Sequence, residues 1–501
     1  MSASTGSDGH DGLSPERPKR TLAAGKALLR HGMPDWLLLK RGDVWQEGLG
    51  HWKLSGRSPR EPMVVAAYGP ATARPLLQTG SEDGLTIVGG GGTPARIEHL
   101  AFVGLHFQPH RYEGTVSCVG ARVLRPSRHL LFEDCHFQDY TTNLVLDAYD
   151  GRHEELRVRR CVVVDAWALH GVAGVGHPQG LYAYAVDGLL IEENLFDHNG
   201  WRAGVPDAGP DVFRHNLYIN NGNTGVTVRG NIIANASSHG MQLRCGGTAT
   251  DNLFVRNAIA LSVGGGNAPE PGGVTGLVAG NVILDGKDID PEHPRGWGLW
   301  FGNIAQGEVS GNLVAHNSLG MMPRALLIAG DARGDTGPTV GVHDLRIRGN
   351  VFYDWGGSLV VEGDASQLTG IVLEDNDFQE PRRDLLAEFG DPDGAAALLW
   401  SGNRLGGPSA PSDASVQLGG RRVPLAQWLT SLGPHALDPR PAHHPDPQRG
   451  VPSYCHSVGL DASLAAFLEQ ARSQSRGRWR PEIMASALNR HMRDGFGLGC
   501  D

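Results

Sequence analysis

Side chains that can move protons or bind carboxylates recur at matching places in three segments of the chain, residues 179–184, 215–220 and 239–244. The most reactive of them are His215, Tyr218, His239 and Arg244. An imidazole can accept a proton, a phenol can donate one, and a guanidinium can neutralise a carboxylate. Together these groups could remove a proton next to a carboxylate and protonate an oxygen that leaves.

The three segments align as successive copies of one strand, because apolar residues alternate with polar or aromatic ones in each. Alternation turns the apolar residues into the core and the others outward, in two columns. The first column is Tyr182, Tyr218 and Gln242, continued by Ser262 and Trp300; the second is Tyr184, Asn220 and Arg244. Small residues flank this face at Ala260, Gly264, Gly298 and Gly302. Aromatic rings with planar polar groups suit a sugar chain, so Tyr182, Tyr184, Asn220, Gln242 and Trp300 are predicted to bind substrate.

Two interpretations of His215 and His239 stay open. Strict alternation would turn both inward, as a stacked structural pair in a corner of the fold. Both residues also begin their strands, where a turn can aim a side chain outward. In that case one of them is a general base beside Arg244 and Tyr218.

A short phrase that repeats along the chain, in which Asn precedes an apolar pair, indicates the scaffold. It occurs at Asn194, Asn231, Asn252, Asn281, Asn312, Asn350 and Asn376, and Cys takes the place of Asn at Cys135 and Cys161. Irregular spacing of roughly 21 to 38 residues is typical of a β-solenoid with variable loops. We expect the Asn side chains to stack and bond between coils, in a turn whose conformation Asn tolerates. A leucine-rich repeat is disfavoured because its helix pattern is missing.

The solenoid is predicted to span residues 35–380. Residues 1–34 form an N-terminal segment with a capping helix at residues 21–30. Residues 381–501 form an irregular and helical C-terminal extension packed on the solenoid, with helices at residues 461–472 and 481–492.

Composition excludes several classes of protein. The chain has 501 residues and a net charge of -10 with no basic run, which argues against a nucleic-acid partner. No apolar run is long enough for a membrane span. Six cysteines are too few and too scattered for a disulfide scaffold or a zinc site, although Cys455 and Cys500 could pair.

No cofactor is predicted. Asp147, Asp150 and Asp165 could hold calcium, but no loop carries densely alternating acidic residues. The chain shows no signal peptide, and its opening, residues 4–15, looks like the start of a mature exported protein behind an added Met1. We therefore expect a secreted or periplasmic location.

The Asn-studded coils, the helix before the first strand and the opening segment together resemble the right-handed parallel β-helix proteins of the pectate-lyase-like superfamily. The likeness covers about residues 4–380. It implies an all-β fold, a right-handed parallel β-helix with an N-terminal capping helix and a partly helical C-terminal tail. It also implies a carbohydrate-active enzyme whose partner is a polysaccharide or oligosaccharide: a lyase, a C5-epimerase or a glycoside hydrolase.

Three functions can be compared against the residues. Lyases of this superfamily often use Lys or Arg as the base, and alginate-type enzymes use His or Tyr; because lysines are scarce here, a Lys base is disfavoured. A polysaccharide lyase would use Arg244 as carboxylate neutraliser, His215 or His239 as base and Tyr218 as acid. A hydrolase would need paired carboxylates, for which the loop residues Asp197, Asp207 and Asp211 are candidates. The third function is carbohydrate binding without catalysis. We predict the lyase, acting by β-elimination on an acidic polysaccharide.

Overall fold

The computed structural model describes residues 1–89, 92–266, 269–317, 320–330, 340–382, 385–406, 415–432, 437–438 and 442–499. The chain forms two units. Unit 1 comprises residues 1–218, 222–227 and 471–480, and unit 2 comprises residues 219–221, 228–470 and 481–501.

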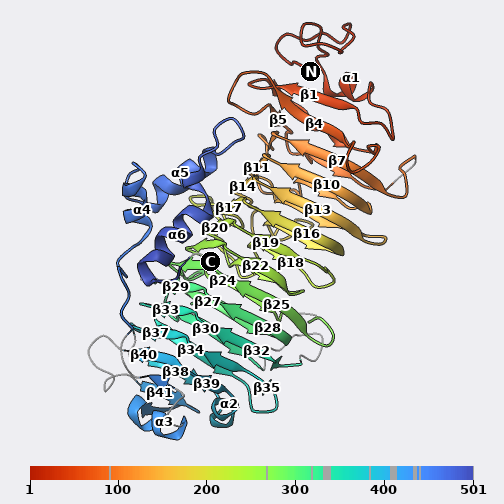
Figure 1. The fold of residues 1–501 in the computed structure, drawn as a ribbon. Coiled ribbons are helices and arrows are strands. Elements are labelled where there is room, and N and C mark those ends of the chain that lie inside the picture. Colours follow the sequence, from red (N-terminus) through yellow and green to blue (C-terminus); the bar gives the residue numbers. More distant parts are fainter. Residues whose placement is uncertain are drawn as a thin grey trace. The chain divides into compact units, whose positions relative to one another are not determined.

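Unit 1 consists of three parallel sheets, to each of which every coil contributes a strand. The first sheet has the order β1 (Trp36–Lys40), β4 (Met63–Tyr68), β7 (Ile97–Val103), β10 (Ser127–Glu133), β13 (His153–Arg159) and β16 (Val186–Glu192). The second has β2 (Val44–Trp45), β5 (Leu76–Gln78), β8 (His106–Gln108), β11 (His136–Gln138), β14 (Val162–Val164) and β17 (Leu195–Asp197). The third has β3 (Gly50–His51), β6 (Leu85–Ile87), β9 (Val119–Val123), β12 (Thr142–Asp147), β15 (Gln179–Tyr184) and β18 (His215–Ile219). Figure 1 shows β4, β7, β10, β13 and β16 side by side.

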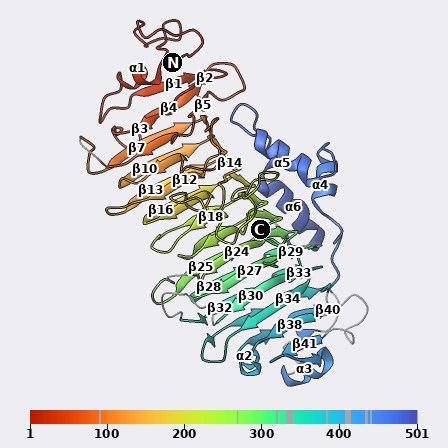
Figure 2. The same ribbon diagram turned by 180° about the vertical axis from the view of Figure 1, so that it is seen from behind.

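Unit 2 repeats this arrangement. Its first sheet has β22 (Gly247–Thr250), β25 (Val274–Ala279), β28 (Ile304–Ser310), β32 (Leu345–Arg348), β36 (Val372–Glu374) and β39 (Leu399–Ser401), with the short β31 (Val342–His343) and β35 (Leu368–Thr369) beside them. Its second has β20 (Ile232–Ala234), β23 (Leu253–Val255), β26 (Val282–Leu284), β29 (Leu313–Ala315), β33 (Val351–Tyr353), β37 (Asp377–Gln379), β40 (Asn403–Gly406) and β43 (Leu437–Asp438). Its third has β21 (His239–Leu243), β24 (Ile259–Gly264), β27 (Trp297–Gly302), β30 (Arg324–Ala329), β34 (Gly357–Glu362), β38 (Leu385–Phe389), β41 (Ser415–Leu418) and the antiparallel β42 (Arg421–Pro424). Figure 2 labels β24, β27, β30, β34, β38 and β41 in this order. The last residue of β18, Ile219, belongs to unit 2, and the remaining strand, β19 (Thr227–Arg229), likewise includes residues of both units. The predicted parallel β-helix is thus confirmed, and its parallel pairing continues beyond residue 380 through β41.

Helices are few and short. They are α1 (Leu22–Lys26), α2 (Pro392–Ala396), α3 (Leu425–Leu432), α4 (Val451–Ser457), α5 (Leu464–Ser473) and α6 (Ala485–Phe496), with the 3₁₀ turn η1 (Pro481–Ile483). The helix α1 begins after Thr21, whose hydroxyl accepts a hydrogen bond from the Ala24 amide at 3.2 Å. In unit 2, α6 contacts β23 and β26. In the part of the chain that the structure describes, no helix is long and apolar enough to cross a membrane.

Stacked Asn side chains form a hydrogen-bonded ladder through the interior of unit 2. Each carboxamide nitrogen donates to the carboxamide oxygen of the next Asn, at 2.8 to 3.0 Å. The ladder comprises Asn231, Asn252, Asn281, Asn312, Asn350, Asn376 and Asn403. In unit 1, Asn194 accepts a hydrogen bond from the Cys161 amide at 2.8 Å, so Cys161 takes the ladder position of an Asn. Cys135 and Cys161 are both buried.

The role expected for Asn in the turn is wrong. The left-handed conformation belongs to the residue before the ladder Asn, such as Asp251 with φ 54° or Gly280 with φ 65°. The Asn itself points inward, where its side chain bonds to the next coil. The stacked carboxamides, and not the tolerance of Asn for left-handed backbone, therefore explain the repeat.

A second, shorter Asn ladder, which the repeat did not indicate, lies in unit 1. Asn143 donates to Asn199 at 3.0 Å, and Asn199 donates to Asn216 at 2.8 Å, all three fully buried. Apolar side chains stack in the same way; the rings of Phe107 and Phe137 lie 5.0 Å apart and nearly parallel. Cys500 lies outside the described residues, and Cys455, which the sequence suggested as its partner, is a buried free cysteine in the structure.

Candidate functional site

The predicted site residues fall into two groups, one in each unit. Tyr182, Tyr184, His215 and Tyr218 belong to unit 1, on β15 and β18. Asn220, His239, Gln242, Arg244 and Trp300 belong to unit 2, where β21 and β27 carry His239, Gln242 and Trp300. Each group is therefore described within its own unit.

Three side chains of unit 1 form an aromatic cluster. The rings of Tyr182 and Tyr218 lie 5.2 Å apart in an edge-to-face arrangement, and the His215 ring lies 5.3 Å from that of Tyr218. Tyr184 is more open, with 38% of its surface exposed. The cluster combines an imidazole with two phenols at the surface of one sheet, which suits contact with sugar rings.

Buried polar residues hold this cluster in place. The Gln179 carboxamide oxygen accepts from the His215 amide at 2.8 Å, and its nitrogen donates to the Phe213 carbonyl at 2.9 Å. Arg214 is buried and donates to the Ala168 carbonyl at 3.0 Å, and its pKa is lowered by burial. Because Arg214 precedes His215, these contacts fix the entry into β18.

Of the two orientations considered for His215 and His239, the structure has the outward one. Two successive residues follow each His on the inner side, which breaks strict alternation. Gly240 faces inward, because a Cβ there would lie 2.9 Å from the buried Asn257 side chain, and Met241 is fully buried. Asn216 and Leu217 are likewise fully buried, and Asn216 belongs to the shorter Asn ladder of unit 1. His215 and His239 therefore lie on the outer side of their strands.

Two of the small residues predicted to flank the outer face, Ala260 and Gly298, do not lie on it. Gly298 points inward, since a Cβ there would meet Val314 at 2.9 Å, and Ala260 precedes the inward Leu261 in the same register. Gly264 and Gly302 lie in register at the far ends of β24 and β27.

In unit 2, Gln242, Ser262 and Trp300 lie on neighbouring strands in register. Gln242 and Ser262 are 5% and 1% exposed. The Gln242 Oε1, Ser262 Oγ and Trp300 Nε1 atoms are buried and make no hydrogen bond to any described residue. Buried polar atoms of this kind cost stability, so three of them in one column indicate a surface built to bind a polar ligand.

A turn of three glycines shapes this surface beside Arg244. Gly264, Gly265 and Gly266 follow one another with φ of 66°, 61° and 84°, a backbone that other residues rarely adopt. A Cβ on Gly266 would lie 2.8 Å from the Arg244 Nε, and one on Gly265 would lie 3.7 Å from the Trp300 ring. The turn therefore brings backbone against both side chains.

His239 lies between aromatic and cationic groups. Its ring centroid is 6.2 Å from that of Trp300, and its Nδ1 is 3.1 Å from the Ser238 hydroxyl. Burial first, and then the charges of Arg244 and Arg295, lower the pKa of His239 to about 3. The imidazole is therefore neutral at ordinary pH, and the same burial and charges make it a weak base as long as no anion lies beside the two arginines.

Trp297, Arg295 and Arg324 belong to the same surface, and the sequence interpretation missed them. Trp297 is in register with Ile259, which is in register with His239, so it continues the His239 column. The guanidinium of Arg295 lies 4.7 Å from the Trp297 ring and that of Arg324 lies 5.3 Å from it. Aligning residues 297–300 with residues 239–242 would have placed Trp297 in this column.

Two of the three aspartates proposed for hydrolysis, Asp197 and Asp211, have side-chain partners in the structure. Asp197 pairs with Arg472 at 2.5 Å, and Asp165, considered for calcium, pairs with both Arg472 and His198. The backbone carbonyl of Asp207 accepts from the His170 amide at 2.6 Å, and Asp211 lies 3.5 Å from His170. Among the described residues, no group of three or more His, Cys, Asp and Glu side chains could hold a metal ion.

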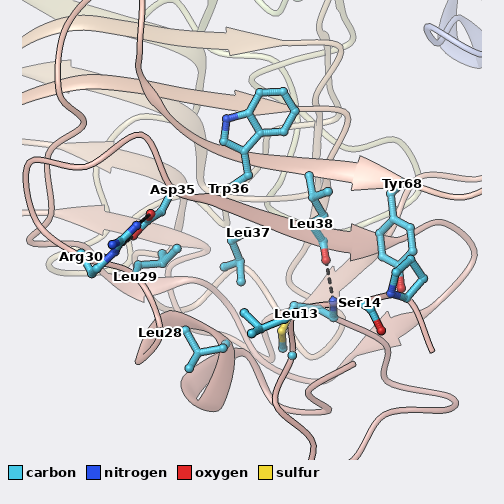
Figure 3. A pocket seen from close by; sticks show the side chains of 14 residues that line it. Leu13, Ser14, Leu28, Leu29, Arg30, Asp35, Trp36, Leu37, Leu38 and Tyr68 are labelled. Carbon is cyan, nitrogen blue, oxygen red and sulfur yellow. Dashed lines mark hydrogen bonds and ion pairs between the residues drawn. The ribbon is translucent and has the colours of Figure 1, made fainter. Parts of the chain in front are cut away.

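A pocket of about 380 Å³ lies at the N-terminal end of unit 1, away from these residues in the sequence. Leu13, Leu28, Leu37 and other apolar side chains line much of it (Figure 3). Its charged lining residues, Arg30 and Asp35, pair with each other at 2.6 Å. The pocket contains none of the predicted site residues.

Comparisons with known proteins concern the fold. No protein-family model matches the sequence, and no curated protein matches it. Among solved structures, an alginate lyase from Paenibacillus sp. str. FPU-7 is 12% identical, with a TM-score of 0.39 over 66% of this chain and 92% of that chain. A mannuronic acid specific polysaccharide family 6 lyase from human gut microbiota is 16% identical, with a TM-score of 0.45 over 76% and 83%. A GH136 lacto-N-biosidase from Eubacterium ramulus is 13% identical, with a TM-score of 0.37 over 83% and 64%. The likeness to these carbohydrate-active enzymes is one of β-helix fold alone.

Proposed function

We propose that the protein is a polysaccharide lyase that cleaves an acidic, uronate-containing polysaccharide by β-elimination. The proposal rests on the surroundings of His239. Its imidazole is kept neutral by burial and by the charges of Arg244 and Arg295, and it lies beside the ring of Trp300. A base, a cationic partner for a carboxylate and an aromatic platform for a sugar are the groups that this reaction needs.

The proposed reaction needs no external reactant. His239 takes the proton from C5 of the uronate, the electron pair of that bond forms the C4=C5 double bond, and the C4–O bond breaks. Arg244 neutralises the carboxylate, which takes up negative charge as the proton leaves. The departing oxygen takes a proton from an acid.

Substrate binding would strengthen the base. Arg244 and Arg295 disfavour the protonated form of His239 by repulsion. A uronate carboxylate placed against Arg244 offsets part of that repulsion, so it raises the pKa of His239. The driving force for proton transfer then increases only when a charged substrate is bound.

The roles proposed in unit 1 stay predictions. Tyr218 is the candidate acid and His215 the second candidate base, and both belong to the aromatic cluster with Tyr182. Replacing Tyr218 with Phe keeps the ring and removes the phenolic proton. The variant therefore separates a role as acid from one as a sugar-stacking surface.

The decisive experiment measures ultraviolet absorbance of unsaturated products from a panel of uronate polymers. We expect the wild type to form such products and His239→Gln to lower kcat by about 10²- to 10⁴-fold. His456→Gln, which changes an exposed His on α4, is the matched control and should keep full activity.

Other outcomes would contradict the proposal. New reducing ends without added absorbance would indicate hydrolysis. Binding of polymers without any cleavage would indicate a carbohydrate-binding protein. Full activity of a correctly folded His239→Gln variant would remove His239 from the mechanism.

A further inference from the structure

Two guanidinium groups of unit 2 contact the same indole ring. Arg295, which directly precedes Gly296 and β27, lies 4.7 Å from the Trp297 ring centroid, and Arg324 at the start of β30 lies 5.3 Å from it. Such contacts are favourable for each cation, but they also bring two like charges together. Desolvation and then the charge of Arg324 lower the pKa of Arg295.

The two cations differ in their partners. Arg324 pairs with Glu362 at 2.8 Å. Arg295 forms no ion pair with a described residue; its Nη1 donates to the Pro294 carbonyl at 2.8 Å. Two carboxylates lie near Arg295 and act on it through their charge, Asp288 and Asp290. Asp288 accepts from the Arg295 and Met321 amides, and Asp290 pairs with His293 at 2.9 Å, so neither forms an ion pair with the Arg295 guanidinium.

Buried polar atoms in this cluster are also unsatisfied. The Nε of Arg295 and the Nε1 of Trp297 are buried and make no hydrogen bond to any described residue. Both groups can only donate a hydrogen bond, and neither can accept one. Two unsatisfied donors beside two guanidinium groups suit a ligand that accepts hydrogen bonds and is negatively charged.

We infer that Arg295, Trp297 and Arg324 form a subsite that recognises the carboxylate of a uronate unit, distinct from the unit that reacts at His239. The inference rests on the proposed function for its ligand class. In this subsite Arg295 binds the carboxylate, the Trp297 Nε1–H donates a hydrogen bond to the ligand, and Arg324, held by Glu362, supplies the second charge.

The subsite continues the column of the candidate base. His239, Ile259 and Trp297 are in register on successive strands, and Arg324 follows on the next. Neighbouring strands are about 4.8 Å apart, so Trp297 lies about 10 Å from His239 along the stack. An extended oligosaccharide could therefore contact both, and the protein would select chains that carry a charge beyond the cleavage point.

The test measures binding without turnover, by calorimetry in a His239→Gln background. The probes are tetrasaccharides of mannuronate, guluronate and galacturonate, each beside its carboxyl-reduced counterpart. Arg295→Gln should weaken binding of the preferred uronate by about 10- to 100-fold, because a hydrogen-bonded charge contact is lost. It should leave binding of the carboxyl-reduced form within about twofold.

Arg256→Gln is the matched control, because Arg256 is 47% exposed on the same unit and lies 3.9 Å from Asp285. It should bind the uronate like its parent. Equal loss for charged and reduced ligands, unchanged binding in Arg295→Gln, or no uronate binding by the parent would each overturn the inference. A charge-dependent loss in a protein whose wild type forms no unsaturated product would support the subsite and contradict the lyase.

Discussion

Two polar columns run through unit 2, and they differ in how their hydrogen bonds are satisfied. In the inner Asn ladder, Asn312 donates to Asn350 at 2.8 Å and to the Val278 carbonyl at 2.9 Å, and accepts from Asn281 at 2.9 Å. In the outer column, the buried Oε1 of Gln242 and Oγ of Ser262 have no hydrogen-bond partner among the described residues.

The difference separates structure from function. A fully satisfied buried network stabilises a fold, whereas an unsatisfied one costs free energy. A chain retains such a cost where the polar atoms serve a ligand. The comparison predicts that mutations in the ladder mainly change stability and that mutations in the outer column mainly change binding.

The largest effect is expected for Asn312→Ala. The change leaves the amide and carboxamide nitrogens of Asn281 without their acceptor and the Val278 carbonyl without its side-chain donor. Each unsatisfied buried group costs about 1–3 kcal/mol, so we expect a loss of roughly 3–5 kcal/mol, measured by urea denaturation. A loss below about 1 kcal/mol would contradict the structural role of the ladder.

An intermediate effect is expected from acid, through His239. Its pKa falls from the ordinary value to about 3 in the folded protein, so between these values the unfolded chain binds a proton that the folded one does not. Stability is therefore fully present above pH ~6.5 and is lost progressively as the pH falls toward 3. From this group alone we expect a loss of about 2 kcal/mol between pH 7 and pH 5, at about 1.4 kcal/mol per unit.

The measurement compares thermal unfolding of the wild type and His239→Gln at both pH values. Acid should destabilise the wild type more than the variant, since the other titrating groups are common to both. The ladder contains no titratable side chain, so Asn312→Ala should lose the same stability at pH 7 and pH 5. Equal acid sensitivity of the wild type and His239→Gln would show that His239 is not held neutral by folding.

The sequence predicted what repeats in every coil. Alternation placed Gln242, Ser262 and Trp300 on one face, because strand register is repeated along the stack. It did not decide the direction of His239, because the inward turn of Gly240 before Met241 depends on how the strand leaves its corner. The local pattern of residues carries no signal for such a break in alternation.

Residues that enter the site from loops were missed for a different reason. Arg295 lies before β27, and its contact with Trp297 depends on a loop anchored by Asp288, which accepts from the Arg295 and Met321 amides. The repeated Asn pattern does not determine the path of this loop. The alignment of strands could have identified Arg324, since it begins a strand in register with Trp297. A basic residue at the start of a strand is common, however, and does not by itself indicate a binding site.

The smallest effect on stability is expected for Gln242→Met. This variant also tests most directly whether the outer column binds a ligand while the inner Asn ladder stabilises the fold. Methionine keeps the length of the side chain and removes an oxygen that has no partner, so stability should stay within about 0.5 kcal/mol or rise slightly. Thermal unfolding checks this, and calorimetry with uronate tetrasaccharides should show weaker binding in the same variant. A loss of stability like that of Asn312→Ala would mean that the outer column holds the fold together.

Unchanged stability with weaker binding is the result that only a ligand-binding column explains. In that case the Gln242 Oε1 contributes no interaction until a sugar hydroxyl donates a hydrogen bond to it.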